Sequence, residues 1–197
     1  DESIEKTILS GMGQAAGSDS TRLDLNFLAP AQSENELGQL GGYHILEVLG
    51  QGGMGMVLKA KDPDLQRIVA LKVMKPQLSA DQDARERFLQ EARAAAAIDD
   101  DNIVQIFQVG EDQNVAFIAM QFLLGESLND RIKREGQLPQ AEILRIGRET
   151  AQGLAAAHAR GLIHRDIKPD NIWLQSGQDR VKIVDFGLVR SSEQDVA

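Results

Sequence analysis

The stretch GLIHRDIKPDNIWL, residues 161–174, brings an acid, a base and an amide close together in the sequence: Asp166, Lys168 and Asn171. Pro169 lies between them, so a continuous helix is disfavoured and we expect a loop. In such a loop an aspartate can accept a proton from a hydroxyl group, and a lysine can stabilise charge on a transferred group. An asparagine amide oxygen can bind a divalent metal ion. The stretch therefore indicates a segment that carries chemistry.

A carboxylate and a glycine-rich turn elsewhere in the chain fit the same chemistry. Asp185 begins the tripeptide DFG and adds an oxygen ligand of the kind Mg²⁺ prefers. The run GQGGMGMV, residues 50–57, has β-type sequence on both sides, so its glycines are predicted to close a hairpin rather than to open a helix. A glycine-rich hairpin lets backbone N–H groups approach phosphates closely. On its own, this run would fit a plain hairpin equally well.

A lysine in an apolar strand is a further candidate site residue. Lys72 ends VALK within the predicted strand 67–74, where a buried charge needs a partner. Glu91, on the predicted helix 81–98, is the candidate partner. Oxygen ligands, a phosphate-covering hairpin and a buried lysine together indicate phosphoryl transfer from a nucleoside triphosphate.

In their order and spacing, these motifs resemble the protein kinase family. LGQGGMGMVLKAKD, VALK, EARAAAA, HRDIKPDNIWL and DFG are most similar to the eukaryotic-like Ser/Thr protein kinases of bacteria, over about residues 43–190. The resemblance implies transfer of the γ-phosphate of ATP to Ser/Thr hydroxyls of proteins, with ATP and Mg²⁺ as cofactors. It also implies control by phosphorylation through Arg165, with autophosphorylation or a dimer partner as further expectations.

The resemblance also implies a role for each matching residue. The catalytic residues are Asp166 as base and Lys168 at the γ-phosphate, and the metal ligands are Asn171 and Asp185. The implied ATP-binding residues are Leu49, Gly50, Gly52, Gly55, Val57, Ala70, Lys72, Glu91, Met120, Gln121, Leu123 and Trp173. Family members usually have a smaller aliphatic residue at position 173. The sequence leaves open whether the indole narrows the adenine pocket or turns away from it.

The expected fold is α+β and protein-kinase-like. We predict a largely disordered acidic linker over 1–42, with seven acidic residues against two basic ones. A kinase N-lobe over 43–124 is expected to have a five-stranded antiparallel sheet and one helix, followed by a partial, mainly helical C-lobe over 125–197. A long helix is predicted over 139–160, and short strands at about 171–174 and 180–184.

Composition excludes several classes of protein. The net charge of −9 argues against nucleic acid as the main partner, because phosphate backbones require clustered basic residues. The absence of cysteine excludes disulfides and cysteine-based zinc sites. No apolar run approaches the roughly 20 residues that span a bilayer. The resemblance is compatible with a cytoplasmic kinase domain of a membrane-anchored protein.

The end of the chain leaves the hypotheses about activity open. The sequence stops 12 residues after Asp185 and begins without methionine, so we expect a piece of a longer protein. One hypothesis is a protein Ser/Thr kinase with an incomplete catalytic domain, and the other is a truncated, catalytically silent module that binds nucleotide and acts through a partner. The form of HRDIKPDN disfavours a third class, the small-molecule phosphotransferases.

Overall fold

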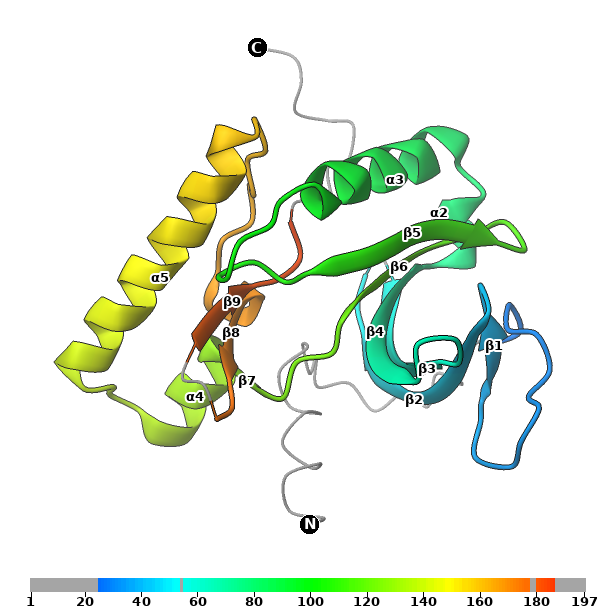
Figure 1. The fold of residues 1–197 in the computed structure, drawn as a ribbon, viewed down its shortest axis with the longest axis horizontal. Helices are drawn as coiled ribbons and strands as arrows, with labels where there is room; N and C mark the ends of the chain where they lie inside the picture. The colour runs from blue at the N-terminus through cyan, green and yellow to red at the C-terminus, as the bar shows by residue number, and fades with distance from the viewer. Residues whose placement is uncertain (1–24, 54, 178–179, 187–197) are drawn as a thin grey trace.

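The computed structural model describes residues 25–53, 55–177 and 180–186, and Figure 1 shows their arrangement. In chain order the elements are β1 (Gly38–Leu40), β2 (Tyr43–Gln51), β3 (Gly55–Asp62), β4 (Arg67–Met74), α2 (Pro76–Ser79), α3 (Gln82–Ala96), β5 (Ile106–Asp112), β6 (Val115–Gln121), β7 (Gly125–Ser127), α4 (Leu128–Glu135), α5 (Gln140–Ala159), the 3₁₀ turn η2 (Pro169–Asn171), β8 (Ile172–Gln175) and β9 (Arg180–Ile183).

A six-stranded sheet of order β1-β2-β3-β4-β6-β5 dominates the first half of the chain, and every pair in it is antiparallel. The interior strand β6, between β4 and β5, is buried along six consecutive residues, as its apolar sequence VAFIAM requires. The β5–β6 turn has positive φ at Gln113 (50°) and Asn114 (63°), the backbone that a tight two-residue hairpin favours. Helix α3 packs along β5 on one side of this sheet (Figure 1).

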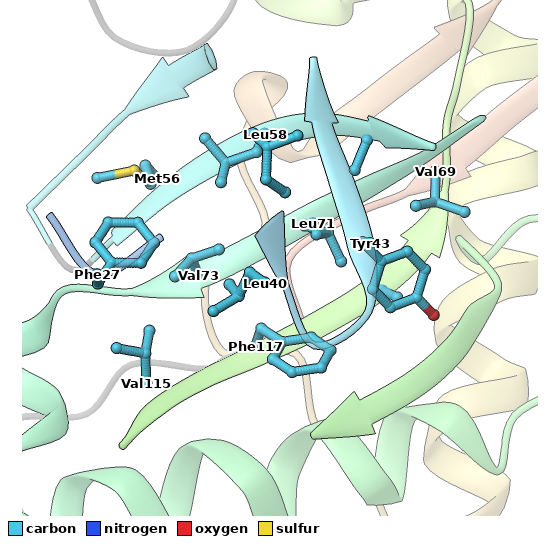
Figure 2. Close-up of a cluster of buried hydrophobic side chains, with 13 residues drawn as sticks. Phe27, Leu40, Tyr43, Met56, Leu58, Val69, Leu71, Val73, Val115 and Phe117 are labelled. Atoms are coloured by element: carbon cyan, nitrogen blue, oxygen red, sulfur yellow. The ribbon is translucent and has the colours of Figure 1, made fainter. Parts of the chain in front are cut away.

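The main core lies on the other face of the same sheet. Figure 2 shows its cluster of buried side chains, which includes Leu58, Leu71 and Phe117, each at most 1 % exposed. Tyr43 meets the Phe117 ring edge-on at a centroid distance of 6.1 Å. Hydrophobic burial on this scale is the main term that stabilises such a sheet.

The two longest helices have ends that the sequence explains. The Asp81 carboxylate caps α3 by accepting hydrogen bonds from the backbone N–H groups of Asp83 (3.0 Å) and Ala84 (3.2 Å). Helix α5 begins after Pro139 and ends at Ala159, close to the predicted range 139–160. Gly161, just beyond it, has φ of 73°, the left-handed conformation that ends many helices.

A small three-stranded sheet has the order β7-β8-β9. Hydrogen bonds join its strand β9 to the loop before β5. Val104 donates its backbone N–H to the carbonyl of Ile183 (3.0 Å), and Ile183 donates to the carbonyl of Asn102 (2.7 Å). The Asn102 side chain also donates to the carbonyl of Val181 (3.1 Å). These bonds hold the strand that precedes Asp185 against the loop between α3 and β5.

Residues 25–42 correct the linker prediction. Strand β1 pairs with β2, Ala29 and Gln39 exchange two backbone hydrogen bonds of 2.9 Å, and Phe27 is buried in the main core at 8 % exposure. The predicted five strands are present, and β1 is a sixth. Pairing with β2 satisfies backbone groups that a disordered linker would leave to water. Residues 1–24, the rest of the predicted linker, lie outside the described residues.

Candidate active site

The glycine-rich run forms the predicted hairpin between β2 and β3. The backbone N–H of Gly52 donates to the carbonyl of Gly55 at 2.8 Å, and Gly50 lies opposite Val57 in the ladder. A Cβ atom on Gly55 would lie 2.1 Å from the carbonyl oxygen of Val73, so only glycine fits there without a backbone shift. The close approach of the hairpin to β4 therefore explains one of the three motif glycines.

Lys72 lies in the middle of the large sheet, between Val57 of β3 and Ile118 of β6. Its Nζ is 2.9 Å from Oδ1 of Asp185, and the two side chains are 15 % and 23 % exposed. Because both side chains are largely shielded from water, solvent screens the attraction between their charges less than it does in a surface ion pair. The structure thus brings two predicted site residues, 113 positions apart in the sequence, into direct contact.

The predicted pair of Lys72 with Glu91 is wrong for this structure. Within the described ranges, Glu91 forms no ion pair with Lys72, whose partner is Asp185. Burial raises the pKa of the Glu91 carboxyl, and the positive charge of Arg165 opposes that rise. Sequence spacing showed that Glu91 lies on α3, but the position of α3 relative to the sheet decides which cation it approaches.

The predicted catalytic loop brings Asp166, Lys168 and Asn171 together. Lys168 Nζ donates to Asp166 Oδ2 at 2.8 Å, and Asn171 Nδ2 donates to the Asp166 carbonyl (2.8 Å) and to Oδ2 (3.1 Å). The hydrogen bond from Lys168 is the largest cause that lowers the pKa of the Asp166 carboxyl. Asp166 is therefore ionised at neutral pH and can accept a hydrogen bond from a hydroxyl.

His164 supports this loop from within the core. It is 1 % exposed, its Nε2 lies 3.0 Å from the carbonyl oxygen of Val184, and its ring packs on Phe186 at a centroid distance of 4.7 Å. Burial lowers the pKa of the imidazole, which favours the neutral ring. The neighbouring Arg165 and Asp185 have positive φ of 64° and 59°, a strained backbone that recurs at functional sites.

The oxygen atoms of this loop suit a magnesium ion. Asn171 uses its amide nitrogen to bond Asp166, so the amide oxygen of Asn171 points away from Asp166. Asp185 contributes a carboxylate near that segment, because Val184 donates its N–H to the Asn171 carbonyl at 3.0 Å. The described residues contain no cluster of three or more acidic or histidine side chains that could hold a metal alone. Mg²⁺ is commonly bound by one or two protein oxygens together with the phosphates of a substrate, so Asn171 and Asp185 fit this ion.

The predicted adenine-site residues form one buried cluster, which we call the base cluster. It contains Leu49, Val57, Ala70, Val104, Met120, Leu123, Trp173 and Val184. Six of these eight were predicted from the sequence, and they come from strands, from the β6–β7 connection and from β8. Gln121, another of the predicted ATP-binding residues, donates its backbone N–H to the Gln105 carbonyl at 2.8 Å.

Two members of the base cluster were not predicted. Val104 precedes β5, and Val184 precedes Asp185 in the sequence IVDFG. Val184 could have been found from its place beside the DFG motif. Val104 carried no such signal, because only the bonds that join its loop to β9 bring it near β8.

Comparisons with known proteins show which family the chain is similar to. A family model described as "Protein kinase domain" matches residues 43–197. Serine/threonine-protein kinase PknJ of Mycobacterium tuberculosis is 44 % identical over 153 residues, which are 76 % of this chain and 26 % of PknJ. Serine/threonine-protein kinase pkn2 of Myxococcus xanthus is 38 % identical over 159 residues, 80 % of this chain and 19 % of that protein.

Solved structures agree in fold. The crystal structure of the PknI kinase domain of Mycobacterium tuberculosis superposes with a TM-score of 0.70 at 34 % identity, covering 77 % of this chain and 62 % of that one. The α+β kinase fold predicted from the sequence is confirmed. The chain spans about a quarter or less of these two curated relatives and less than two thirds of the solved domain.

Proposed function

The chain belongs to the protein kinase family, and on that premise we propose that it carries the ATP- and Mg²⁺-binding part of a protein Ser/Thr kinase. The observation that carries the proposal is the pair Lys72–Asp185, at 2.9 Å, beside the loop that joins Asp166, Lys168 and Asn171. A cation, a metal-type carboxylate and an ionised base in one place suit phosphoryl transfer.

Each of these side chains has a proposed task. Asp166 accepts the proton of the substrate hydroxyl, and Lys168, which is bonded to it, stabilises negative charge on the transferred group. Lys72 binds the non-transferred phosphates beneath the glycine-rich hairpin. Asn171 and Asp185 hold Mg²⁺, which when bound neutralises phosphate charge. The acceptors are Ser/Thr hydroxyls of proteins, and the chain itself or a dimer partner is a candidate acceptor.

A catalytically silent nucleotide-binding module is the second candidate. It is favoured by one observation: in the described structure, Glu91 forms no ion pair with Lys72, the partner that the family resemblance implies for it. Two discriminating assays are the transfer of radiolabelled γ-phosphate from ATP to a generic serine- and threonine-containing protein and to the chain itself. If the first candidate is right, radiolabelled phosphate is incorporated into protein. If the second is right, ATP binds and no phosphate is incorporated.

The test of the shared proposal is thermal unfolding with ATP, with and without Mg²⁺. At an ATP concentration 100-fold above Kd, binding stabilises the folded state by about 2.7 kcal/mol. Lys72→Met and Asp185→Asn should each abolish the Mg²⁺-dependent rise in Tm. Lys61→Met, which removes an exposed lysine of the same sheet, should preserve it. A rise of equal size in both site variants would overturn the assignment.

The location of the protein stays a prediction. Within the described part of the chain, no helix combines the length and the apolarity that crossing a bilayer requires.

A further inference from the structure

Trp173 is one of the ATP-binding residues predicted from the sequence. It is on β8, two residues after Asn171, and pairs with Ser127 of β7 and Lys182 of β9. It is the only tryptophan of the chain. Its backbone is therefore held by strands on both sides, and only its side chain has freedom to move.

The indole is packed inside the base cluster. It is 8 % exposed, and it shares this cluster with Val57 and Ala70 of the large sheet and with Leu123 of the β6–β7 connection. Val57, Ala70 and Leu123 are themselves 8 %, 6 % and 7 % exposed. The side chains proposed to enclose a planar base are thus already covered by protein atoms, those of the indole among them.

The polar edge of the indole is also engaged. Nε1–H donates to the carbonyl oxygen of Leu124 at 3.4 Å, a long hydrogen bond to the residue that follows the predicted ATP-binding residue Leu123. An indole and an adenine are both planar bicyclic rings, and each carries an N–H donor, the ring N–H of the indole and the exocyclic amino group of adenine.

Two cavities bear on this cluster, and the smaller one borders it at Val104 and Met120. The larger one, of about 470 Å³, is lined by Gly42, Asp64 and Phe107 among others, and none of its lining residues belongs to the base cluster. The smaller one, of about 20 Å³, is lined by Lys72, Met120 and Asp185 among others. Neither of these two cavities is lined by Trp173.

We propose that Trp173 is a gate on the base pocket: its indole takes part of the space of the purine, and nucleotide binds only when the indole leaves the Leu124 carbonyl. This inference rests on the proposed function. The observed affinity for nucleotide is then lowered by the fraction of molecules in which the indole is displaced. A displaced fraction of about one tenth weakens the observed Kd about tenfold.

The first test uses the unmodified chain, because its single tryptophan reports on the gate directly. Titration with MgATP should shift the indole emission to longer wavelength as the side chain moves from the buried cluster toward water. The half-saturation should coincide with that of the rise in Tm. If ATP saturates the protein while the emission maximum stays in place, whether or not its intensity falls, the base binds beside an unmoved indole and the gate is refuted.

The second test removes the bulk of the ring. Trp173→Leu should bind ATP about tenfold more tightly than the unmodified chain, and Trp173→Phe should lie between the two. Phe107→Leu makes an aromatic-to-leucine change at a partly buried residue packed against the main core and should leave the Kd unchanged. Trp173→Leu must first show a cooperative unfolding transition; where it does not, the emission titration of the unmodified chain decides.

The outcomes separate the two proposals. Equal Kd values, within twofold, for the unmodified chain and Trp173→Leu refute the gate and leave the nucleotide site in place. Binding by Trp173→Leu alone supports both. No binding by any of the folded variants refutes the proposed function, and the gate with it.

Discussion

Replacement of Phe27 by alanine tests whether the segment before β2 belongs to the folded unit. Phe27 is 8 % exposed and lies in the main core with Met56 and Val73, as Figure 2 shows. Its segment is held by the Ala29–Gln39 bridge and by β1. If this packing is formed in solution, the substitution leaves a cavity that the surrounding β-strands can close only in part.

The magnitude follows from the size of the lost side chain. Phenylalanine-to-alanine changes in protein cores cost about 3–5 kcal/mol, and the partly exposed edge of Phe27 places it at the lower end, about 3 kcal/mol. For a chain of this length, 1 kcal/mol shifts Tm by about 2–4 °C. We therefore expect Tm to fall by about 6–12 °C.

Thermal unfolding followed by circular dichroism, without nucleotide, measures this shift. Leu37→Ala is the matched control, because Leu37 belongs to the same segment and is 46 % exposed. It should change stability by no more than about 0.5 kcal/mol. If Phe27→Ala and Leu37→Ala have the same Tm as the unmodified chain, the segment is a linker and the packing argument is refuted.

Three further predictions concern single side chains. Gly55→Ala should lower the stability measured by urea unfolding by more than about 1 kcal/mol, because the new Cβ meets a backbone carbonyl at 2.1 Å, whereas Gly52→Ala, with open space around it, should be nearly neutral. Burial raises the pKa of Glu91, so its contribution to stability is fully present below the unfolded-state pKa and is lost as pH rises through the folded-state value. Glu91→Gln should accordingly raise Tm at pH 7 and reduce its dependence on pH between 4 and 7, and an unchanged Tm profile would contradict the burial argument. Ser127→Ala should cost about 1 kcal/mol in chemical unfolding, because the serine oxygen caps α4 by accepting from the Asp130 N–H at 3.1 Å; a loss below about 0.3 kcal/mol would show that the cap is not formed.

Most of the fold could be predicted from local pattern. The apolar runs in β4 and β6, the glycines between β2 and β3, and the start of α5 at Pro139 each carry a signal within a few residues. The short strands β1 and β7 were missed, because three residues are too few to show a period of two. Phe27 was missed because an apolar residue in a polar segment has no pattern around it.

The sequence by itself predicted which residues would carry the chemistry, because the family motifs name Lys72, Asp166, Asn171 and Asp185. The comparisons place the chain in the protein kinase family. Only the tertiary structure decided how these residues pair. Which anion Lys72 meets depends on the position of α3 against the sheet, and the structure selects Asp185. The position of the Trp173 indole depends on the space that the β-strands leave around it and on its hydrogen bond to the Leu124 carbonyl. The structure buries the indole in the base cluster. Both outcomes depend on distances between segments far apart in the chain, which local sequence pattern does not encode.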